Sequence, residues 1–373
     1  MMNRVNLESL AETLAHGMAE NTAERDLSAT FATNNHKNLQ EHKLFSALIP
    51  LEIGGGGAKY SEMAKFLRKI AKYNASTALA LAMHQHLISA AVYNNINGKP
   101  GRKLMDTVVA DETILVSTGA NDWMESNGEA IRTQGGYIVT ARKPFASGST
   151  AAHVLVTSVR VNDPELGAQV LHFSIPIKTD GISFSNDWDT LGMRESGSQT
   201  IILERVFIPD RAIILTRPQQ GYCAIFDVVL PCALPLIMSV YLGVAEAAAE
   251  IAVDLAKKRE GDEVTPFLIG EMINHLTTAQ ITVNDMISLT NNLEFTASAE
   301  VSNAILIRKT IAVNAVVNTV EKAMEAAGGA GFYRKHGLER MLRDIHAAQF
   351  HPMQEKRQHQ FSGRIALSLP PVE

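Results

Sequence analysis

The spacing of apolar residues changes twice along this chain, and that change limits its possible folds more than any other feature. Up to about residue 115 apolar residues recur with a helical period, as at Leu7, Leu10 and Leu14. Short runs of Val, Ile and Thr then lie between turn residues, and the helical period returns near residue 213. We predict an α+β protein with an N-terminal helical domain (1–115), a central β-domain (116–212) and a C-terminal four-helix bundle (213–373).

In the first part, the run from Ser76 to Val92 is apolar throughout and carries His84 and His86, so we expect a buried helix there. In the middle part, Gln134-Gly135-Gly136 has the composition of a hairpin turn. No helical pattern separates the expected strands, which disfavours a parallel dinucleotide-binding sheet and favours a small antiparallel barrel or sandwich. The expected strands are Ile114–Ser117, Ala130–Thr133, Tyr137–Ala141, Val154–Val159, Val170–Ile175 and Thr200–Val206.

The last part contains three long helical patterns, Ala245–Lys258, Phe267–Asn291 and Ala304–Ala327, which are typical of a helical bundle. Some of their faces are apolar enough to predict oligomerisation. The stretch from Val228 to Ala245 has 18 uncharged residues, close to the lower limit for a membrane span. Because Pro231 and Pro235 interrupt it early and it continues into an amphipathic pattern, we interpret it as a buried bundle helix.

Composition narrows the class of partner. The chain has 373 residues, 39 acidic against 34 basic, and a net charge of −5, whereas a nucleic-acid-binding surface usually needs a basic excess. Two cysteines cannot form a disulfide framework, and charged residues interrupt the N-terminus where a signal peptide would need an apolar run. We therefore expect a cytoplasmic protein that binds neither nucleic acid nor membrane.

Four stretches in a fixed order resemble the acyl-CoA dehydrogenase superfamily, and the match covers nearly the whole length. The resemblance implies that superfamily's fold, a bound flavin (FMN or FAD), a small-molecule substrate and a homotetramer. The stretches are Ile49–Gly55, Gly136–Gly148, Leu191–Ser198 followed by Val206–Pro209, and Gly328–Phe332 followed by Leu338–Arg340 and Arg343-Asp344.

The resemblance assigns flavin contacts to residues whose chemistry suits them. A flavin ring needs an apolar wall and hydrogen-bond partners at its polar edge, which Phe145, Ser147 and Gly148 can supply. Gly328, Gly329 and Gly331 offer a bare backbone that can approach a phosphate, and Arg259 is the nearest match to the family's phosphate-binding arginine.

The usual dehydrogenase base is missing from this pattern. Aligning on Arg343-Asp344 places Pro352 where most of the family has a catalytic glutamate, and Val228–Val240 holds no carboxylate. The family's acidic loop after the first strand is replaced by Ser117–Trp123. These departures resemble the two-component flavin monooxygenases related to dibenzothiophene monooxygenase, which take reduced flavin from a separate reductase and add dioxygen at flavin C4a.

Within that branch, the resemblance implies catalytic roles for Ser147, His351, His84 and His86. A C4a-hydroperoxide needs a hydrogen-bond donor in a site that excludes water, and histidine transfers protons near neutral pH. Two alternatives remain open: an acyl-CoA dehydrogenase with a relocated base, and a non-catalytic homologue that serves as a scaffold. His346, His351 and His359 do not share one helical face, so we predict no metal site.

Overall fold

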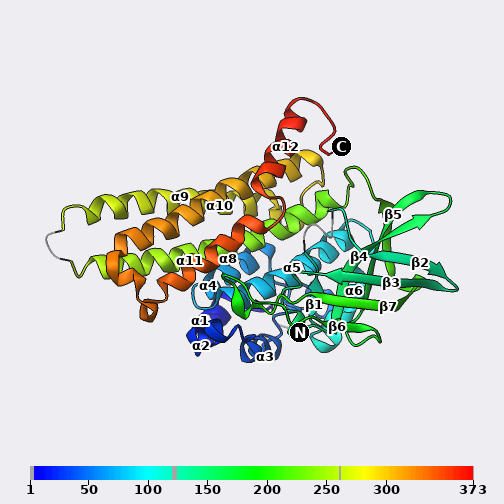
Figure 1. The fold of residues 1–373 in the computed structure, drawn as a ribbon, viewed down its shortest axis with the longest axis horizontal. Helices are drawn as coiled ribbons and strands as arrows, with labels where there is room; N and C mark the ends of the chain where they lie inside the picture. The colour runs from blue at the N-terminus through cyan, green and yellow to red at the C-terminus, as the bar shows by residue number, and fades with distance from the viewer. Residues whose placement is uncertain (1–3, 120–123, 260–261, 373) are drawn as a thin grey trace.

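We describe the protein from a computed structural model, and the description covers residues 4–119, 124–259 and 262–372. A mixed sheet lies at one end of an elongated molecule, and long helices run away from it (Figure 1). The N-terminal part is helical, as predicted, and Gly54–Gly57 separates two of its helices. Its elements are α1 (Leu7–Met18), α2 (Thr22–Ser28), α3 (Thr33–Glu41), η1 (Leu51–Ile53), α4 (Tyr60–Ala71), α5 (Ala75–Ile96) and α6 (Arg102–Asp111).

Helix α5 contains the predicted buried run. Its positions from Ala75 to Tyr93 are almost all buried, because neighbouring helices cover its whole circumference. The side chain of Asn74 accepts a hydrogen bond from the backbone N–H of Thr77, which caps the first turn. The helix therefore starts at a defined residue and carries His84 and His86 into the protein interior.

Eight described strands form one sheet in the order β6-β7-β3-β2-β4-β5-β8, with β1 paired to β4. Six of them match the predicted strands. The prediction of a purely antiparallel domain was wrong, because β1 and β2 both pair with β4 in parallel. The strands are β1 (Leu115–Ser117), β2 (Glu129–Thr133), β3 (Gly136–Lys143), β4 (Val154–Asp163), β5 (Gly167–Pro176), β6 (Ile182–Phe184), β7 (Ile201–Pro209) and β8 (Ile213–Pro218).

The two strands that the sequence pattern did not predict are β6 and β8. Strand β6 has only three residues, and β8 lies at an edge of the sheet, where it pairs with β5. Because β8 spans Ile213–Pro218, the sheet continues past the predicted boundary at residue 212. Short 3-10 turns connect several of these strands: η2 (Ser149–Ala151), η3 (Arg194–Ser196) and η4 (Asp210–Ala212).

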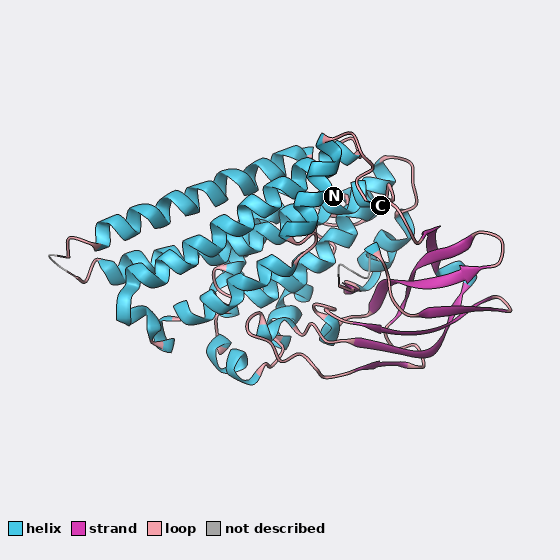
Figure 2. Cartoon of the chain, turned by 45° about the horizontal axis from the view of Figure 1, so that its top comes forward, coloured by secondary structure: helices cyan, strands magenta, loops and turns pink. Residues whose placement is uncertain are grey.

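The C-terminal part is helical, and its three longest helices lie side by side (Figures 1 and 2). They are α8 (Phe226–Ala256), α9 (Thr265–Leu289) and α10 (Ala299–Ala327). The remaining elements are η5 (Asn291–Leu293), η6 (Gly328–Phe332), η7 (Arg334–His336), α11 (Leu338–Ile345), η8 (His346–Phe350) and α12 (Glu355–Ala366). The glycine run ends α10 at Ala327, as predicted, while α12 was not predicted.

Helix α8 is one continuous helix, although the prolines at 231 and 235 were expected to interrupt it. Pro235 has no N–H, so the carbonyl of Pro231 loses its helical partner. The hydroxyl of Tyr60 on α4 donates to the carbonyls of Pro231 and Cys232, at 3.2 and 2.9 Å. By length and composition α8 could cross a membrane, but 94% of its most apolar 18-residue window is buried inside the protein. This agrees with its prediction as a buried helix.

Two apolar cores hold the described residues together. The larger core joins the N-terminal helices to the C-terminal helices, and α8 contributes residues to it along most of its length. The smaller core lies in the β-domain and is built mainly from Val, Leu and Ile side chains of the sheet strands. The helices at both ends of the chain therefore share one packed interior, and the sheet has an interior of its own.

Candidate functional site

The segment after β3 presents an aromatic ring to solvent in a strained conformation. Phe145 has a φ of 58° and is 60% exposed, and its ring meets the edge of Trp188 at a centroid distance of 6.1 Å. A left-handed backbone is costly for a bulky residue and is typically kept at functional positions. Across from it, Gly119 donates its N–H to the carbonyl of Pro144, and a Cβ on Gly119 would lie 3.3 Å from the Phe145 side chain.

Ser147 lies two residues further on, and its hydroxyl is bonded to a second serine. Its Oγ lies 2.8 Å from Oγ of Ser198, which lies 2.7 Å from Oγ of Ser196. Gly148 donates its N–H to the carbonyl of Ser196 at 2.8 Å, so the two segments are also joined through their backbones. Gly148 has a φ of 80° and faces Ala80 of α5, which places the Ser147 segment against that helix.

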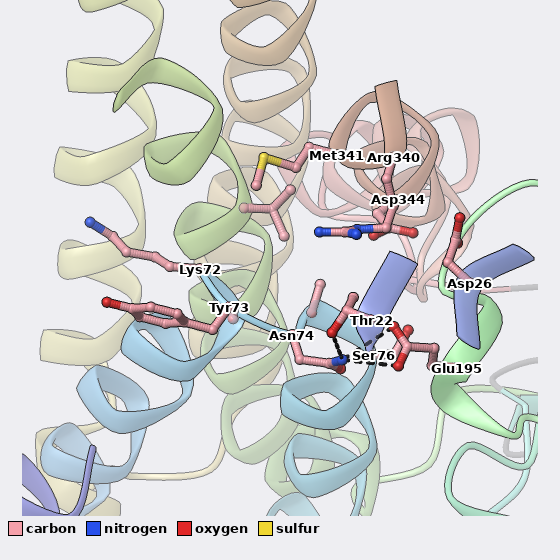
Figure 3. A pocket seen from close by; sticks show the side chains of 13 residues that line it. Thr22, Asp26, Lys72, Tyr73, Asn74, Ser76, Glu195, Arg340, Met341 and Asp344 are labelled. Carbon is pink, nitrogen blue, oxygen red and sulfur yellow. Dashed lines mark hydrogen bonds between the residues drawn. The ribbon is translucent and has the colours of Figure 1, made fainter. Parts of the chain in front are cut away.

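A partly buried cluster of charged side chains and one asparagine, here called the ionic frame, anchors the loop that carries Ser196 and Ser198. Figure 3 shows four of its members, Asp26, Asn74, Glu195 and Asp344. Glu195 accepts from Nε of Arg25 at 2.5 Å and from the side chain of Asn74. Asp344 on α11 accepts from the backbone N–H of Met193, also at 2.5 Å. Burial raises the pKa of Asp344 to about 6. The frame consists of Arg25, Asp26, Asn74, Glu195, Arg343 and Asp344.

Contacts in and beside the ionic frame join two of the motifs that were quoted from the sequence. Arg343 pairs with Asp26 of α2 at 2.5 Å, and its own backbone lies against Gly192. A Cβ on Gly192 would lie 2.3 Å from the carbonyl oxygen of Arg343, closer than any real contact. The Leu191–Ser198 stretch and the Arg343-Asp344 pair therefore form one junction between the β-domain loop, α2 and α11.

His351 lies beyond η8 and forms a pair with Tyr241 of α8. The Tyr241 hydroxyl lies 2.7 Å from Nε2 of His351, and Lys309 of α10 donates to the carbonyls of His351 and Met353 at 2.9 and 3.0 Å. Burial and the nearby Lys309 charge lower the pKa of His351 to about 3, so its ring is neutral at physiological pH. Burial also lowers the pKa of Lys309, to about 8.

The other two predicted catalytic histidines differ in their bonding. His84 uses both ring nitrogens on the backbone: Nε2 bonds the carbonyl of Phe45 at 2.9 Å, and Nδ1 accepts from the N–H of Leu115 at 3.0 Å. The ring therefore ties α5 to the start of β1 and keeps no nitrogen for proton transfer, which argues against its predicted role. His86 is buried, and its Nδ1 has no hydrogen-bond partner in the part of the chain that the structure describes. Burial lowers the pKa of both rings to about 4.

The predicted phosphate-binding residues lie together, but away from Phe145 and Ser147. Nη2 of Arg259 donates to the carbonyl of Ala326, and a Cβ on Gly328 would lie 3.0 Å from Nη1 of the same arginine. Arg259 thus binds the C-terminal end of α10, beside Gly328, Gly329 and Gly331. This turn lies at the end of the long helices opposite to the sheet (Figures 1 and 2), so a single chain does not bring it to the Ser147 segment.

A cleft of about 440 Å³ lies between the sheet, the start of α8 and α12. Its charged described residues are Arg160 of β4, Arg357 and Arg364 of α12, and Glu125. Glu125 pairs with Arg357 at 3.2 Å, and its carbonyl accepts from Arg160 at 3.3 Å. The lining also contains Met353, two residues beyond His351, together with Phe226 and Phe361. Three guanidinium groups and one carboxylate suit an anionic ligand with an apolar portion.

The described residues fit a flavin ring. Phe145 offers an exposed aromatic face, which a flat π-system can cover, and Ser147 offers a hydroxyl nearby. Among the described residues, the buried Oγ of Ser117 at the end of β1 has no hydrogen-bond partner and could bind a polar ring edge. Part of the predicted acidic-loop replacement, residues 120–123, lies outside the described residues.

Sequence reasoning missed several of these residues. Ser198 was inside a quoted motif, but the sequence pattern did not indicate its bond to Ser147. Tyr241 lies in an apolar helix, where a tyrosine is ordinarily a core residue, and the cleft arginines lie in segments with no motif. Only the fold shows which partner each of these side chains meets.

Comparisons with known proteins identify the family and the fold. The family profile described as "Acyl-CoA dehydrogenase, N-terminal domain" matches residues 4–100, and the profile described as "Acyl-CoA dehydrogenase, C-terminal domain" matches residues 236–356. A putative acyl-CoA dehydrogenase, YdbM of Bacillus subtilis, is 24% identical over 361 residues, covering 91% of each chain. Dibenzothiophene monooxygenase of Rhodococcus qingshengii is 25% identical over 378 residues, covering 91% of this chain and 88% of the relative.

Among solved structures, KijD3 in complex with FMN and dTDP-3-amino-2,3,6-trideoxy-4-keto-3-methyl-D-glucose has a TM-score of 0.88 and 23% identity, covering 97% of this chain and 93% of KijD3. It shares the fold from the N-terminal helices to the C-terminal ones. The two family profiles cover more than half of this chain and both of its helical parts. This chain therefore belongs to the acyl-CoA dehydrogenase superfamily.

Proposed function

We propose that this protein is a flavin-dependent monooxygenase that acts on a small molecule with reduced FMN and dioxygen. The observation that carries the proposal is the pairing of an exposed aromatic face at Phe145 with the Ser147 hydroxyl, in a chain whose His351 is paired with a tyrosine and not with a carboxylate. The dibenzothiophene monooxygenase relative and the FMN-bound neighbour support the same choice.

Each residue has a defined task in this proposal. Bound reduced FMN would supply the two electrons that activate dioxygen. Phe145 would form one wall of the ring site, and Ser147 would donate a hydrogen bond at its polar edge. The arginines of the cleft would hold the phosphate end. The neutral pair of Tyr241 and His351 would offer hydrogen bonds to a bound molecule without placing a permanent charge in the interior.

The alternative, an acyl-CoA dehydrogenase with a relocated base, needs a carboxylate that is free to remove a proton. The four buried carboxylates described in the C-terminal part and its adjoining loop are already engaged in the fold, and one of them, Glu246, accepts from Arg68 at 2.9 Å and from Gln280 at 2.8 Å. Glu195 and Asp344 belong to the ionic frame, and Asp227 accepts from the hydroxyls of Tyr222 and Ser302 at 2.6 and 2.8 Å. These bonds favour the monooxygenase.

The proposal includes an assembly and a partner. Phe267 and Ile281 on α9 are 77% and 65% exposed, so the long helices keep apolar surface that another copy would cover. We propose that the protein is a cytoplasmic homotetramer and that its C-terminal part forms a four-helix bundle. In this assembly a neighbouring copy would bring its turn at Arg259 and Gly328 near the flavin. We also propose that the sheet closes into a barrel or a sandwich, as expected from the sequence. A separate reductase would supply reduced FMN.

The test begins with flavin binding. The purified protein should bind reduced FMN more tightly than FAD, and with oxygen present it should oxygenate an aromatic sulfur heterocycle such as dibenzothiophene. Dye reduction with a panel of acyl-CoA thioesters would instead identify a dehydrogenase. Failure to bind either flavin would overturn both readings and favour a scaffold. Unchanged turnover in both Ser147→Ala and His351→Ala would refute the residue assignments.

A further inference from the structure

Three serine hydroxyls form an unbranched chain that ends at Ser147. The two links, Ser147 to Ser198 and Ser198 to Ser196, measure 2.8 and 2.7 Å, and all three side chains are buried. The chain is held by its surroundings: Ser149 donates from Oγ to the carbonyl of Gly197 at 2.8 Å, and Ala146 donates from N–H to the carbonyl of Gln199 at 3.3 Å. The hydroxyl oxygens are therefore fixed relative to one another.

Counting protons restricts the direction of these hydrogen bonds. Each hydroxyl donates one proton and accepts up to two, so the two links use two of the three protons. The unused proton belongs to Ser147 if both links run from Ser196 towards Ser147. It belongs to Ser196 if both run the other way, and to Ser198 if both links end there. Ser198 cannot donate to both neighbours, so no fourth arrangement exists.

Burial selects among the three arrangements. Among the residues that the structure describes, Ser196 Oγ and Ser198 Oγ have no hydrogen-bond partner outside this chain of three hydroxyls. A buried donor without an acceptor is unfavourable, so the unused proton is not left on either of them. Ser147 is the least buried of the three and follows the exposed Phe145 by two residues. The favoured direction runs from Ser196 through Ser198 to Ser147.

We infer that Ser196 and Ser198 are positioning residues that make the Ser147 hydroxyl a hydrogen-bond donor to the ligand beside Phe145. The inference rests on the proposed function for the identity of that ligand, an FMN ring. Because Ser147 already accepts a bond from Ser198, its own proton is left for the ligand. The ionic frame contributes by holding Glu195, the residue next to Ser196, against Arg25 and Asn74.

Replacement of Ser198 tests the chain of three hydroxyls without altering Ser147 itself. Ser198→Ala should weaken FMN binding about five- to ten-fold, the ratio that one oriented hydrogen bond contributes. It should also reduce the shift of the FMN visible absorbance on binding, as Ser147→Ala does. Ser198→Thr keeps the hydroxyl and should restore both. Ser196→Ala should have a smaller effect, because the remaining link can then run in either direction.

Ser149→Ala is the matched control, because it removes a buried hydroxyl bond from the same loop without interrupting the chain. Thermal unfolding of every variant separates loss of folding from loss of orientation. The inference is overturned if Ser198→Ala keeps the unaltered protein's absorbance shift, or if Ser149→Ala reduces it equally. An unaltered protein that binds no FMN would instead overturn the proposed function and, with it, the donor role of Ser147.

Discussion

The hydroxyl of Tyr241 lies 2.7 Å from Nε2 of His351, which joins the middle of α8 to the segment that follows η8. Burial raises the pKa of Tyr241 well above its usual range, while burial and Lys309 lower that of His351 to about 3. Both groups are therefore uncharged across the physiological range. The proton of this hydrogen bond therefore stays on the Tyr241 hydroxyl, and the neutral His351 ring accepts the bond, so the pair differs from a charged carboxylate base.

Lys309 should make the protein more stable as the pH rises through the alkaline range. Its pKa is about 8 in the folded protein against 10.5 in the unfolded chain, so between these values the unfolded state binds more protons. The free energy of unfolding should rise by about 2–3 kcal/mol from pH 8 to 10.5. Denaturant unfolding at pH 8 and 10.5 measures this, and Lys309→Met should remove the slope. An equal slope in the variant would contradict the assignment.

Buried histidines should make the protein sensitive to acid. His36, His84 and His86 each have a pKa of about 4, below the ordinary 6.5, so the unfolded state binds more protons between these values and stability falls as the pH drops through them. The raised pKa of Asp344 acts in the opposite direction between 3.8 and 6. Because the buried histidines with a lowered pKa, which also include His172 and His351, outnumber the carboxylates whose pKa burial raises, we expect the melting temperature to fall from pH 6.5 to 4.5.

His84→Ala should destabilise the protein and leave flavin binding by the folded fraction unchanged. The change would leave the carbonyl of Phe45 and the N–H of Leu115 without partners in the interior. We expect a loss of about 2–4 kcal/mol in the free energy of unfolding. Denaturant unfolding and FMN titration of the same preparation separate the two effects. A folded variant with normal stability and impaired turnover would restore the catalytic role that the sequence suggested.

Two glycine-to-alanine changes should have opposite effects. At Gly192 the new Cβ would meet the carbonyl oxygen of Arg343, so we expect a loss of more than about 2 kcal/mol and a loosened Ser196–Ser198 loop. Gly270 lies inside α9 with nothing near its Cβ position, so alanine there should stabilise by about 0.5–1 kcal/mol. Thermal unfolding of both variants checks the pair, and equal shifts would contradict the close packing at Gly192.

Arg160→Ala should weaken binding of FMN but not of riboflavin, which lacks the phosphate. The arginine lines the cleft together with Arg357 and Arg364, and a charge-assisted bond to phosphate contributes about 1.5–3 kcal/mol, or roughly ten-fold or more in Kd. Arg142 on β3 is exposed and outside the cleft, so Arg142→Ala serves as the control. Equal losses for the two flavins would place the phosphate elsewhere.

Much of the fold was predictable because apolar periodicity reports burial directly. The helical pattern identified α5, α9 and α10, and runs of Val, Ile and Thr between turn residues identified six strands. Apolar periodicity did not predict the structure where a contact between distant residues decides it. Pro231 and Pro235 remain inside α8 because Tyr60 binds the carbonyl of Pro231, and a contact between positions 171 residues apart leaves no local signal.

The candidate site was predictable only in part, for a similar reason. Phe145 and Ser147 were quoted in a motif, and the structure places Phe145 in a strained, exposed conformation two residues before the buried Ser147. The bonds that give Ser147 its orientation come from Ser198, and Tyr241 meets His351 from another helix. Sequence spacing cannot show which buried hydroxyls share hydrogen bonds. Nor could it show that His84 has both nitrogens engaged.

The single apolar core shared by the first and last helices has a consequence for how the chain comes apart. Since α8 is packed against both α4 and α10, neither terminal segment can melt alone without exposing that helix. The chain is then a helical body with a sheet inserted between its halves, and calorimetry should resolve at most two cooperative units. The first and third segments, expressed separately, would each lack half of an interior. Mixed together, they could fold only by reassociating.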